Sequence, residues 1–187
     1  MSSGVEMRNW FYDPLPTGAT GWSMDNGNNP GTKPTASFSN GQLLIQGHAT
    51  QGNSYALRAA LNVPAGEYVA SFYARSGSAP TFFANRLLSV LNTNWASFGT
   101  VPAAALNTRH IFRFTNPTEQ RIIFAFQAPN NEACVAYERI LLCTADDYER
   151  LSELAVEWFS GSTYTIGGGG LSLLAVYPHH LELEVVA

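Results

Sequence analysis

Charged residues are scarce in this 187-residue chain. They make up 13% of the sequence, about half of the share that is usual in soluble globular proteins. Lys33 is the single lysine among ten basic residues, and fourteen acidic residues bring the formal net charge to −4. This leaves no broad basic surface, so we expect no nucleic-acid partner. Hydrophobic residues at 45% and aromatic residues at 12% argue against an intrinsically disordered chain.

Long apolar runs are also missing. No stretch of about 18 apolar residues is available to cross a membrane. The opening residues, MSSG, lack the basic and apolar regions of a signal peptide. We therefore expect a protein that is made in the cytoplasm without a signal peptide and does not insert into a membrane.

Cysteine occurs twice, as Cys134 and Cys143. Both lie in one segment that is predicted to be extended, which would place their Cα atoms roughly 30 Å apart. A disulfide between them is too long to form. We expect two reduced, buried thiols.

Motifs for catalysis and metal binding are absent. The histidines His48, His110, His179 and His180 fit neither an HExxH motif nor a Cys/His zinc pattern. His110 begins a predicted strand and is expected to be half-buried and structural. The glycine run 167–170 lacks the Lys and Ser/Thr of a phosphate-binding loop. We expect a protein that is not an enzyme and has no cofactor.

What the sequence does contain is a series of short strands. Eight segments have strand character and are separated by turn signals such as Asn40-Gly41: 35–38, 41–47, 54–62, 66–75, 86–92, 108–115, 121–127 and 133–142. Strands of this length and spacing are typical of a sandwich. We predict an all-β protein with a jelly-roll β-sandwich.

Alternation along these segments predicts which side chains form the core. The expected core positions are Tyr55, Leu57, Ala59, Leu61, Tyr68, Ala70, Phe72, Ala74, Phe112, Phe114, Ile122, Phe124 and Phe126. The opposite faces would meet solvent, a ligand or a partner subunit, and they carry Arg58, Ser71, Tyr73, Arg75, Arg109, Ile111 and Arg113.

The regions around the strands differ in character. We divide the chain into an ordered N-terminal lead-in, the sandwich with a short helix, a glycine-rich linker and a C-terminal arm: 1–34, 35–159, 160–170 and 171–187. The helix is predicted over 145–158, because apolar residues recur there at spacings of three and four. Thr144 is its expected N-cap and Gly161 its expected stop.

The C-terminal arm contains a strand-like alternation that cannot bury its apolar face alone. Leu181, Leu183 and Val185 alternate with two glutamates. The arm either returns to an edge of its own sandwich or adds to a neighbouring chain by strand exchange. In the second case these three residues make the assembly contacts of a homo-oligomer.

Two groups of residues are candidates for binding sugar, because sugar rings stack on aromatic faces while amides and arginines bond the hydroxyls. Trp95 with Asn94 lies in the long connection between two predicted strands, and Tyr73 with Arg75 lies on an outward strand face. The alternative for each group is an aromatic residue that packs within the fold or at a subunit interface.

Two carboxylates of the lead-in, Asp13 and Asp25, are weak candidates for a structural calcium site completed by backbone carbonyls.

Several strings make residues 8–164 similar to a known family. They are TGWS at 20–23, Leu57-Arg58, VPAGEYVASFYARS at 63–76, AYERILL at 136–142 and WFSGST at 158–163. Their order and spacing resemble the carbohydrate-binding-module-like jelly rolls in minor tail proteins of phages. The family tends to have aspartates where Ser160 and Ser162 stand here, so its metal site is not carried over.

The resemblance implies a non-enzymatic structural protein of a phage virion, in the tail or its tip. Its partners would be other virion proteins, copies of itself and host-surface carbohydrate. The alternatives are a carbohydrate-binding module, free-standing or linked to an enzyme, and a capsid decoration or fibre protein with the same fold. Glycoside hydrolysis is disfavoured, because no pair of carboxylates can be placed about a common cleft.

Overall fold

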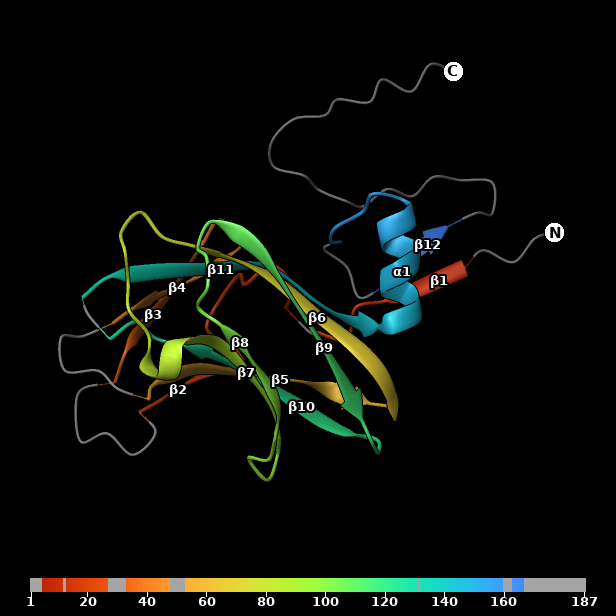
Figure 1. The fold of residues 1–187 in the computed structure, drawn as a ribbon, viewed down its shortest axis with the longest axis horizontal. Coiled ribbons are helices and arrows are strands. Elements are labelled where there is room, and N and C mark those ends of the chain that lie inside the picture. Colours follow the sequence, from red (N-terminus) through yellow and green to blue (C-terminus); the bar gives the residue numbers. More distant parts are fainter. Residues whose placement is uncertain are drawn as a thin grey trace, which may run out of the picture.

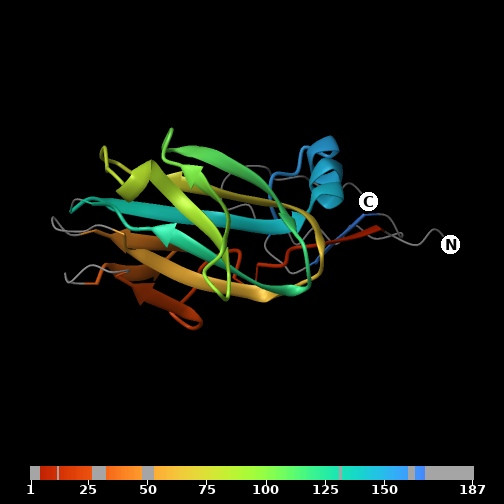
Figure 2. The ribbon, with the colours of Figure 1, turned by 60° about the horizontal axis from the view of Figure 1, so that its bottom comes forward.

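The computed structural model describes residues 5–11, 13–26, 33–47, 53–130, 132–159 and 163–166. Within them, two antiparallel five-stranded sheets pack face to face, and one helix lies at one end of the sandwich (Figures 1 and 2). Sheet I has the order β2-β5-β10-β7-β8, and sheet II has the order β3-β4-β11-β6-β9. A separate two-stranded ribbon joins β1 and β12. The predicted jelly-roll β-sandwich is confirmed.

The elements have the following bounds: β1 Val5–Arg8, β2 Trp22–Asp25, β3 Thr35–Ser39, β4 Gln42–Gln46, β5 Tyr55–Val63, β6 Gly66–Arg75, η1 Phe83–Asn85, β7 Arg86–Asn92, β8 Ser97–Pro102, β9 Thr108–Asn116, β10 Gln120–Gln127, β11 Cys134–Thr144, α1 Ala145–Glu153 and β12 Thr163–Ile166. All eight predicted segments are strands. Sequence reasoning missed β1, β2, β8 and β12, so the lead-in 1–34 and the linker 160–170 both contribute strands. Three of these four strands have only four residues, too few for alternation to stand out from the surrounding loops.

The helix α1 is shorter than predicted. Thr144 caps its N-terminus as expected, since its Oγ1 accepts a hydrogen bond from the N–H of Asp147 at 3.1 Å. The helix ends before Ala155, which has a left-handed φ of +54°. The N–H of Ala155 donates to the carbonyl of Ser152, and the N–H of Val156 donates to that of Leu151. These two bonds form a Schellman motif, so the predicted stop at Gly161 is wrong.

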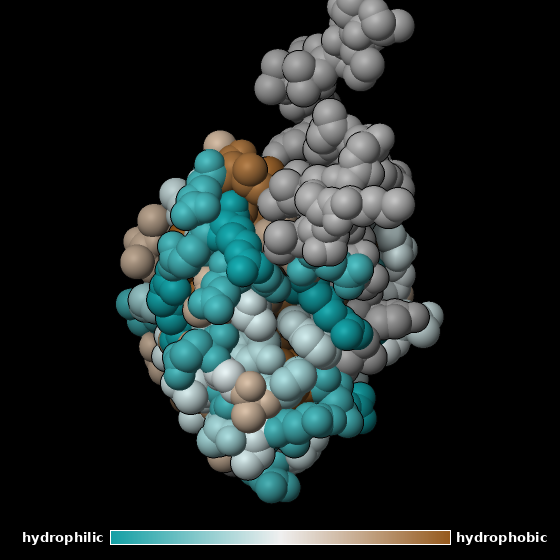
Figure 3. Space-filling model, turned by 90° about the vertical axis from the view of Figure 1, so that its right-hand side faces the viewer, coloured by the Kyte–Doolittle hydropathy of each residue, from teal (hydrophilic) through white to brown (hydrophobic). Residues whose placement is uncertain are grey.

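The chain after α1 turns back onto the outer face of sheet II. Trp158 and Phe159 are buried there, in a cluster with Leu141 of β11 and with Tyr148 and Leu151 of the helix. Both aromatics thereby cover the outer face of sheet II. The described part of this end of the molecule presents mainly hydrophilic residues (Figure 3). No helix among the described residues is long and apolar enough to cross a membrane.

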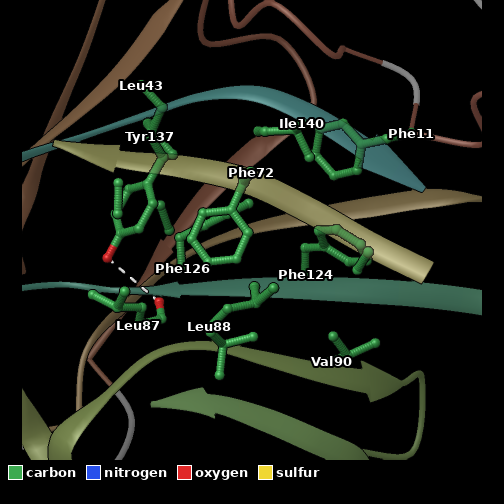
Figure 4. Close-up of a cluster of buried hydrophobic side chains, with 14 of the residues drawn as sticks. Phe11, Leu43, Phe72, Leu87, Leu88, Val90, Phe124, Phe126, Tyr137 and Ile140 are labelled. Carbon is green, nitrogen blue, oxygen red and sulfur yellow. Dashed lines mark hydrogen bonds between the residues drawn. The ribbon is translucent and has the colours of Figure 1, made fainter. Parts of the chain in front are cut away.

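The main core lies between the two sheets. Phe72, Phe124 and Phe126 point into it, as predicted, and each is fully buried (Figure 4). Tyr137 lies among them, with its ring centroid 4.9 Å from that of Phe126. Its hydroxyl donates to the carbonyl of Gln127 at 2.8 Å, so the one polar atom of this ring is satisfied.

Strand β5 faces the opposite way from the prediction. Ala56 is fully buried in the main core, whereas Tyr55 and Leu57 lie in a separate small cluster with Leu91 and Ala125. Arg58, which we expected on an open face, is only 5% exposed. A one-residue irregularity causes this, because β5 carries three steps from Asn62 to Ala59 where β10 carries two from Arg121 to Ile123. Such a bulge exchanges the two faces of a strand along its length.

The lead-in is an integral part of the sandwich. Phe11 is 1% exposed and packs 5.0 Å from Phe124, between ring centroids. The N–H of Trp10 donates to the carbonyl of Leu142, and the N–H of Ile140 donates to that of Pro14. The lead-in therefore occupies the side of β11 beyond the end of β4. This docking accompanies the irregular pairing of β11 with β6 between Glu138 and Leu141.

The two cysteines are free, as expected. Cys143 is buried, but Cys134 is only half-buried. The arm 171–187, with Leu181, Leu183 and Val185, lies outside the described residues.

Candidate functional site

The outer face of sheet I carries a cleft of about 480 Å³. Its lining comes from β2, β5, β7 and β8, from the loop before β5 and from the turn between β7 and β8: Asp25, Asn53, Tyr55, Arg86, Ser89, Leu91, Trp95 and Ser97. This volume lies within the ordinary range of small-molecule sites.

Strand register explains why residues so far apart in sequence meet here. Tyr55 of β5 is paired with Asp25 on one side and with Gln127 on the other. Two residues further along β10, Ala125 is paired with Ser89. Another two residues along, Ile123 lies beside Leu91 of β7. These three rows cover four residue steps of β10, so the cleft extends for about 13 Å along the strands.

One end of the cleft is polar and is organised by Arg86. Its Nη2 donates to the hydroxyl of Tyr55 at 2.7 Å and to Oδ1 of Asn53, and its Nε donates to Oε1 of Gln127 at 3.3 Å. The Tyr55 hydroxyl in turn donates to Asn53. The guanidinium also lies over the rings of Tyr55 and Phe83, at 5.7 and 5.4 Å from their centroids. Arg86 is therefore held in a fixed position by neutral groups.

Burial raises the pKa of Tyr55, and the charge of Asp25 raises it further. The positive charge of Arg86 opposes this, more strongly than the negative charge of Asp25 supports it. Tyr55 thus remains a neutral donor and acceptor at physiological pH. The positive charge of Arg86 is the larger electrostatic influence at its hydroxyl.

The opposite end of the cleft carries Trp95, the indole predicted to bind sugar. It is 53% exposed and has a left-handed φ of +63°, which is uncommon for a bulky residue and costs conformational energy. The turn is fixed by Asn92, whose Oδ1 accepts hydrogen bonds from the N–H groups of Asn94 and Ala96. The N–H of Trp95 also donates to the carbonyl of Asn92 at 3.0 Å. The exposed indole is therefore presented by a rigid turn.

The second predicted pair, Tyr73 and Arg75, lies on β6 of sheet II and does not join this cleft. The Tyr73 hydroxyl donates to Glu157 at 2.6 Å, and Arg75 forms an ion pair with Glu138. The guanidinium groups of Arg75 and Arg139 lie over the Tyr73 ring. The Tyr73 hydroxyl and the Arg75 Nε are thus occupied by neighbouring carboxylates, although Arg75 also lines a pocket on sheet II.

Asp13 and Asp25, the candidate calcium ligands, have different surroundings. Asp13 accepts a hydrogen bond from the Trp22 indole at 3.2 Å, whereas Asp25 lines the cleft. Among the described residues, no group of three or more His, Cys, Asp and Glu side chains could hold a metal ion. His110 is half-buried and stacks on Phe72 at 5.2 Å between centroids, and burial lowers its pKa.

Sequence reasoning found Trp95 but missed most of the cleft. Asn94 lies beside Trp95 in the turn. From sequence, Asp25 was predicted only as a calcium ligand and Tyr55 only as a core residue. Arg86 and Ser89 were not predicted to bind a ligand. The available signal was an arginine and a serine within the apolar run RLLSVLN of β7, where each polar residue needs a partner or an opening to solvent.

Comparisons with known proteins identify the fold. No protein-family model matches the chain, and no curated protein matches it significantly. The solved structure of the carbohydrate-binding module CBM4 is similar, with a TM-score of 0.51 at 12% identity over 72% of this chain and 96% of that one. The enzymatically active domain of tailspike protein 4 from bacteriophage CBA120 also gives 0.51, at 11% identity over 72% of this chain. This protein has a jelly roll like that of carbohydrate-binding modules.

The match covers very different shares of these two known structures. The match spans only 21% of the tailspike chain. A third similar structure is the second N-terminal cellulose-binding domain of Cellulomonas fimi β-1,4-glucanase C, with a TM-score of 0.47 at 16% identity over 77% of this chain and 97% of that one. At these identities the likeness shows the fold alone.

Proposed function

We propose that this chain is a non-catalytic module that binds carbohydrate in the cleft on sheet I. The observation that carries the proposal is the pairing of an exposed, rigidly held Trp95 with a fixed polar group at Arg86 in one cleft. A sugar ring offers an apolar face for the indole and hydroxyls for the polar end. The fold supports the proposal, because the carbohydrate-binding module CBM4 shares it.

The test is affinity electrophoresis and calorimetry with a panel of soluble polysaccharides, using Trp95→Ala and Tyr73→Ala as matched aromatic variants. We expect Trp95→Ala to raise the dissociation constant at least tenfold, which corresponds to about 1.4 kcal/mol, while keeping the melting temperature. Tyr73→Ala should retain binding. If only Tyr73→Ala loses binding, the site lies on sheet II and the assignment of the cleft is wrong.

A structural role in a phage virion is the second candidate. The tailspike domain with the same jelly roll favours it, together with the sequence resemblance to minor tail proteins. Such a role requires contacts between chains, for which Leu181, Leu183 and Val185 are the proposed residues. Light scattering on the full chain and on a chain truncated after Ile166 tests this. A defined oligomer that truncation dissolves supports assembly through the arm, and a monomer in both cases argues against it.

A further inference from the structure

We propose that the cleft on sheet I recognises an acidic sugar chain, in which the carboxylate of a uronic acid pairs with Arg86 while a second ring stacks on Trp95. This inference rests on the proposed carbohydrate-binding function and specifies its ligand class.

Arg86 forms no ion pair within the described residues. The ion pairs among the described residues involve other arginines, namely Arg75, Arg113 and Arg150. Arg86 has only neutral partners there, an amide from each of Asn53 and Gln127 and the hydroxyl of Tyr55. A half-buried cation that lacks a carboxylate partner favours an anionic ligand group, because the protein has already removed part of its hydration.

The geometry leaves donors of Arg86 available for that group. A guanidinium has five N–H donors. Nε and Nη2 are used by the three neutral acceptors, and Nη1 makes no hydrogen bond within the described residues. The neutral partners fix the plane of the group, so a carboxylate meets a preorganised donor rather than a mobile side chain.

Ser89 places a buried hydroxyl at the cleft. Ser89 lines the cleft and is 3% exposed, yet its Oγ has no hydrogen-bond partner among the described residues. Leaving a buried polar group unpaired is unfavourable, and a ligand oxygen would supply the missing partner. Ser89 lies between the Arg86 end and the Trp95 end, in the middle row of the register described above.

The charge of Asp25 does not reverse this preference. Asp25 and Arg86 both act on the hydroxyl of Tyr55, and the influence of Arg86 on that pKa exceeds the opposing influence of Asp25. At the Tyr55 hydroxyl, which Arg86 contacts directly, the positive charge therefore outweighs the negative one.

The length of the cleft selects a chain over a single sugar. The first and last rows lie about 13 Å apart along the strands, which is longer than one pyranose ring, so a ligand that fills the cleft contains more than one ring. The ligand must contain several linked rings, at least one of them acidic.

The experiment compares acidic oligosaccharides with partners that differ in charge alone. The probes are oligogalacturonate and its methyl ester, oligomannuronate and its methyl ester, and free galacturonate as the single-sugar arm. We expect at least one acidic oligomer to bind tenfold or more tightly than its ester. Its affinity should fall as the salt concentration rises from about 50 to about 500 mM, and free galacturonate should bind at least tenfold more weakly.

Variants test the assignment of residues. Arg86→Gln should remove the difference between acid and ester, and Arg113→Gln, which changes an exposed arginine of sheet II, should leave it unchanged. Ser89→Ala is a second test in case the Arg86 variant does not fold, because it removes only a hydroxyl that has no hydrogen-bond partner among the described residues. It should keep the melting temperature and weaken binding of the acidic oligomer severalfold.

The two levels of proposal fail in different ways. If neutral and esterified oligomers bind through Trp95 as tightly as the acids do, or if Arg86→Gln preserves the preference for acids, the acidic ligand is wrong while carbohydrate binding stands. If no oligosaccharide, acidic or neutral, binds the native chain, both proposals are wrong. Equal binding of free galacturonate and the oligomer would overturn recognition of a chain.

Discussion

Asn9 ties the lead-in to β11, and replacing it with alanine should destabilise the whole sandwich. The side chain is 3% exposed. Its Nδ2 donates to the carbonyl of Ile140 at 3.0 Å, and its Oδ1 accepts from the N–H groups of Phe11 at 3.0 Å and Leu142 at 2.9 Å. In the alanine variant, these two buried N–H groups lose their acceptor. The Ile140 carbonyl keeps the Trp158 indole as a donor at 3.3 Å.

A buried polar group without a partner costs about 1 to 3 kcal/mol, so two of them predict a loss of about 3 kcal/mol in the free energy of unfolding. For a chain of this size, that loss lowers the melting temperature by about 6 to 12 °C. Urea unfolding followed by tryptophan fluorescence measures it. Asn94→Ala, at an exposed turn position, is the control and should change stability by about 0.5 kcal/mol or less.

A loss below about 1 kcal/mol for Asn9→Ala, with an unchanged denaturant slope, would refute this reasoning. It would mean that water reaches the two N–H groups or that the lead-in detaches without cost. The lead-in would then be an appendage rather than a part of the sandwich.

Three further predictions concern buried polar groups and thiols. Burial raises the pKa of Glu138, but hydrogen bonds to its carboxylate and the charges of Arg75 and a neighbouring arginine outweigh burial and hold the pKa below its ordinary value. The stabilisation from ionised Glu138 is therefore present above the unfolded pKa and is lost as the pH falls through the folded one. Glu138→Gln should make urea midpoints less sensitive to pH between about 5 and 3, and an unchanged pH dependence would contradict this. Burial raises the pKa of Cys143 to about 12, so a thiol reagent should modify the half-buried Cys134 much faster in the native protein; equal rates would show that β11 opens readily. Tyr137→Phe removes a hydroxyl that donates to a backbone carbonyl of β10 at 2.8 Å, and chemical unfolding should show a loss of about 1 to 2 kcal/mol, whereas a neutral effect would mean that the carbonyl has another donor.

Much of the sandwich could be predicted because its strands carry their own signal. In β6, Phe72 and Ala74 alternate with Ser71, Tyr73 and Arg75, and the predicted bounds match the observed ones. The alternation reports burial on one side of a strand, which is a local property. The bulge in β5 is not local, because it depends on how β5 pairs with β10, some sixty residues later. A single extra residue there was enough to exchange the predicted faces.

The candidate site was predicted only in part for the same reason. Trp95 could be found from sequence, since an indole within a polar turn stands out against its neighbours. Arg86, Tyr55 and Asp25 come from three different strands, and only the order β2-β5-β10-β7 brings them together. The residue pattern of a single strand does not determine the order of strands in a sheet. The polar end of the cleft therefore could not be predicted from the sequence.

The two outer faces of the sandwich differ in whether their polar groups already have hydrogen-bond partners or counter-charges within the described chain. On sheet II, Tyr73 donates to Glu157, and Arg109 donates to the hydroxyl of Ser71 and to the carbonyl of Glu157. The segment after α1 covers this part of the face, and these bonds are made within the chain. On sheet I, Arg86 has only neutral partners among the described residues, and the buried hydroxyl of Ser89 has none there. A fold selected for stability alone would gain from satisfying such groups internally. The presence of both groups in one cleft, beside an exposed indole held in a strained turn, is the physical reason to place the ligand on sheet I.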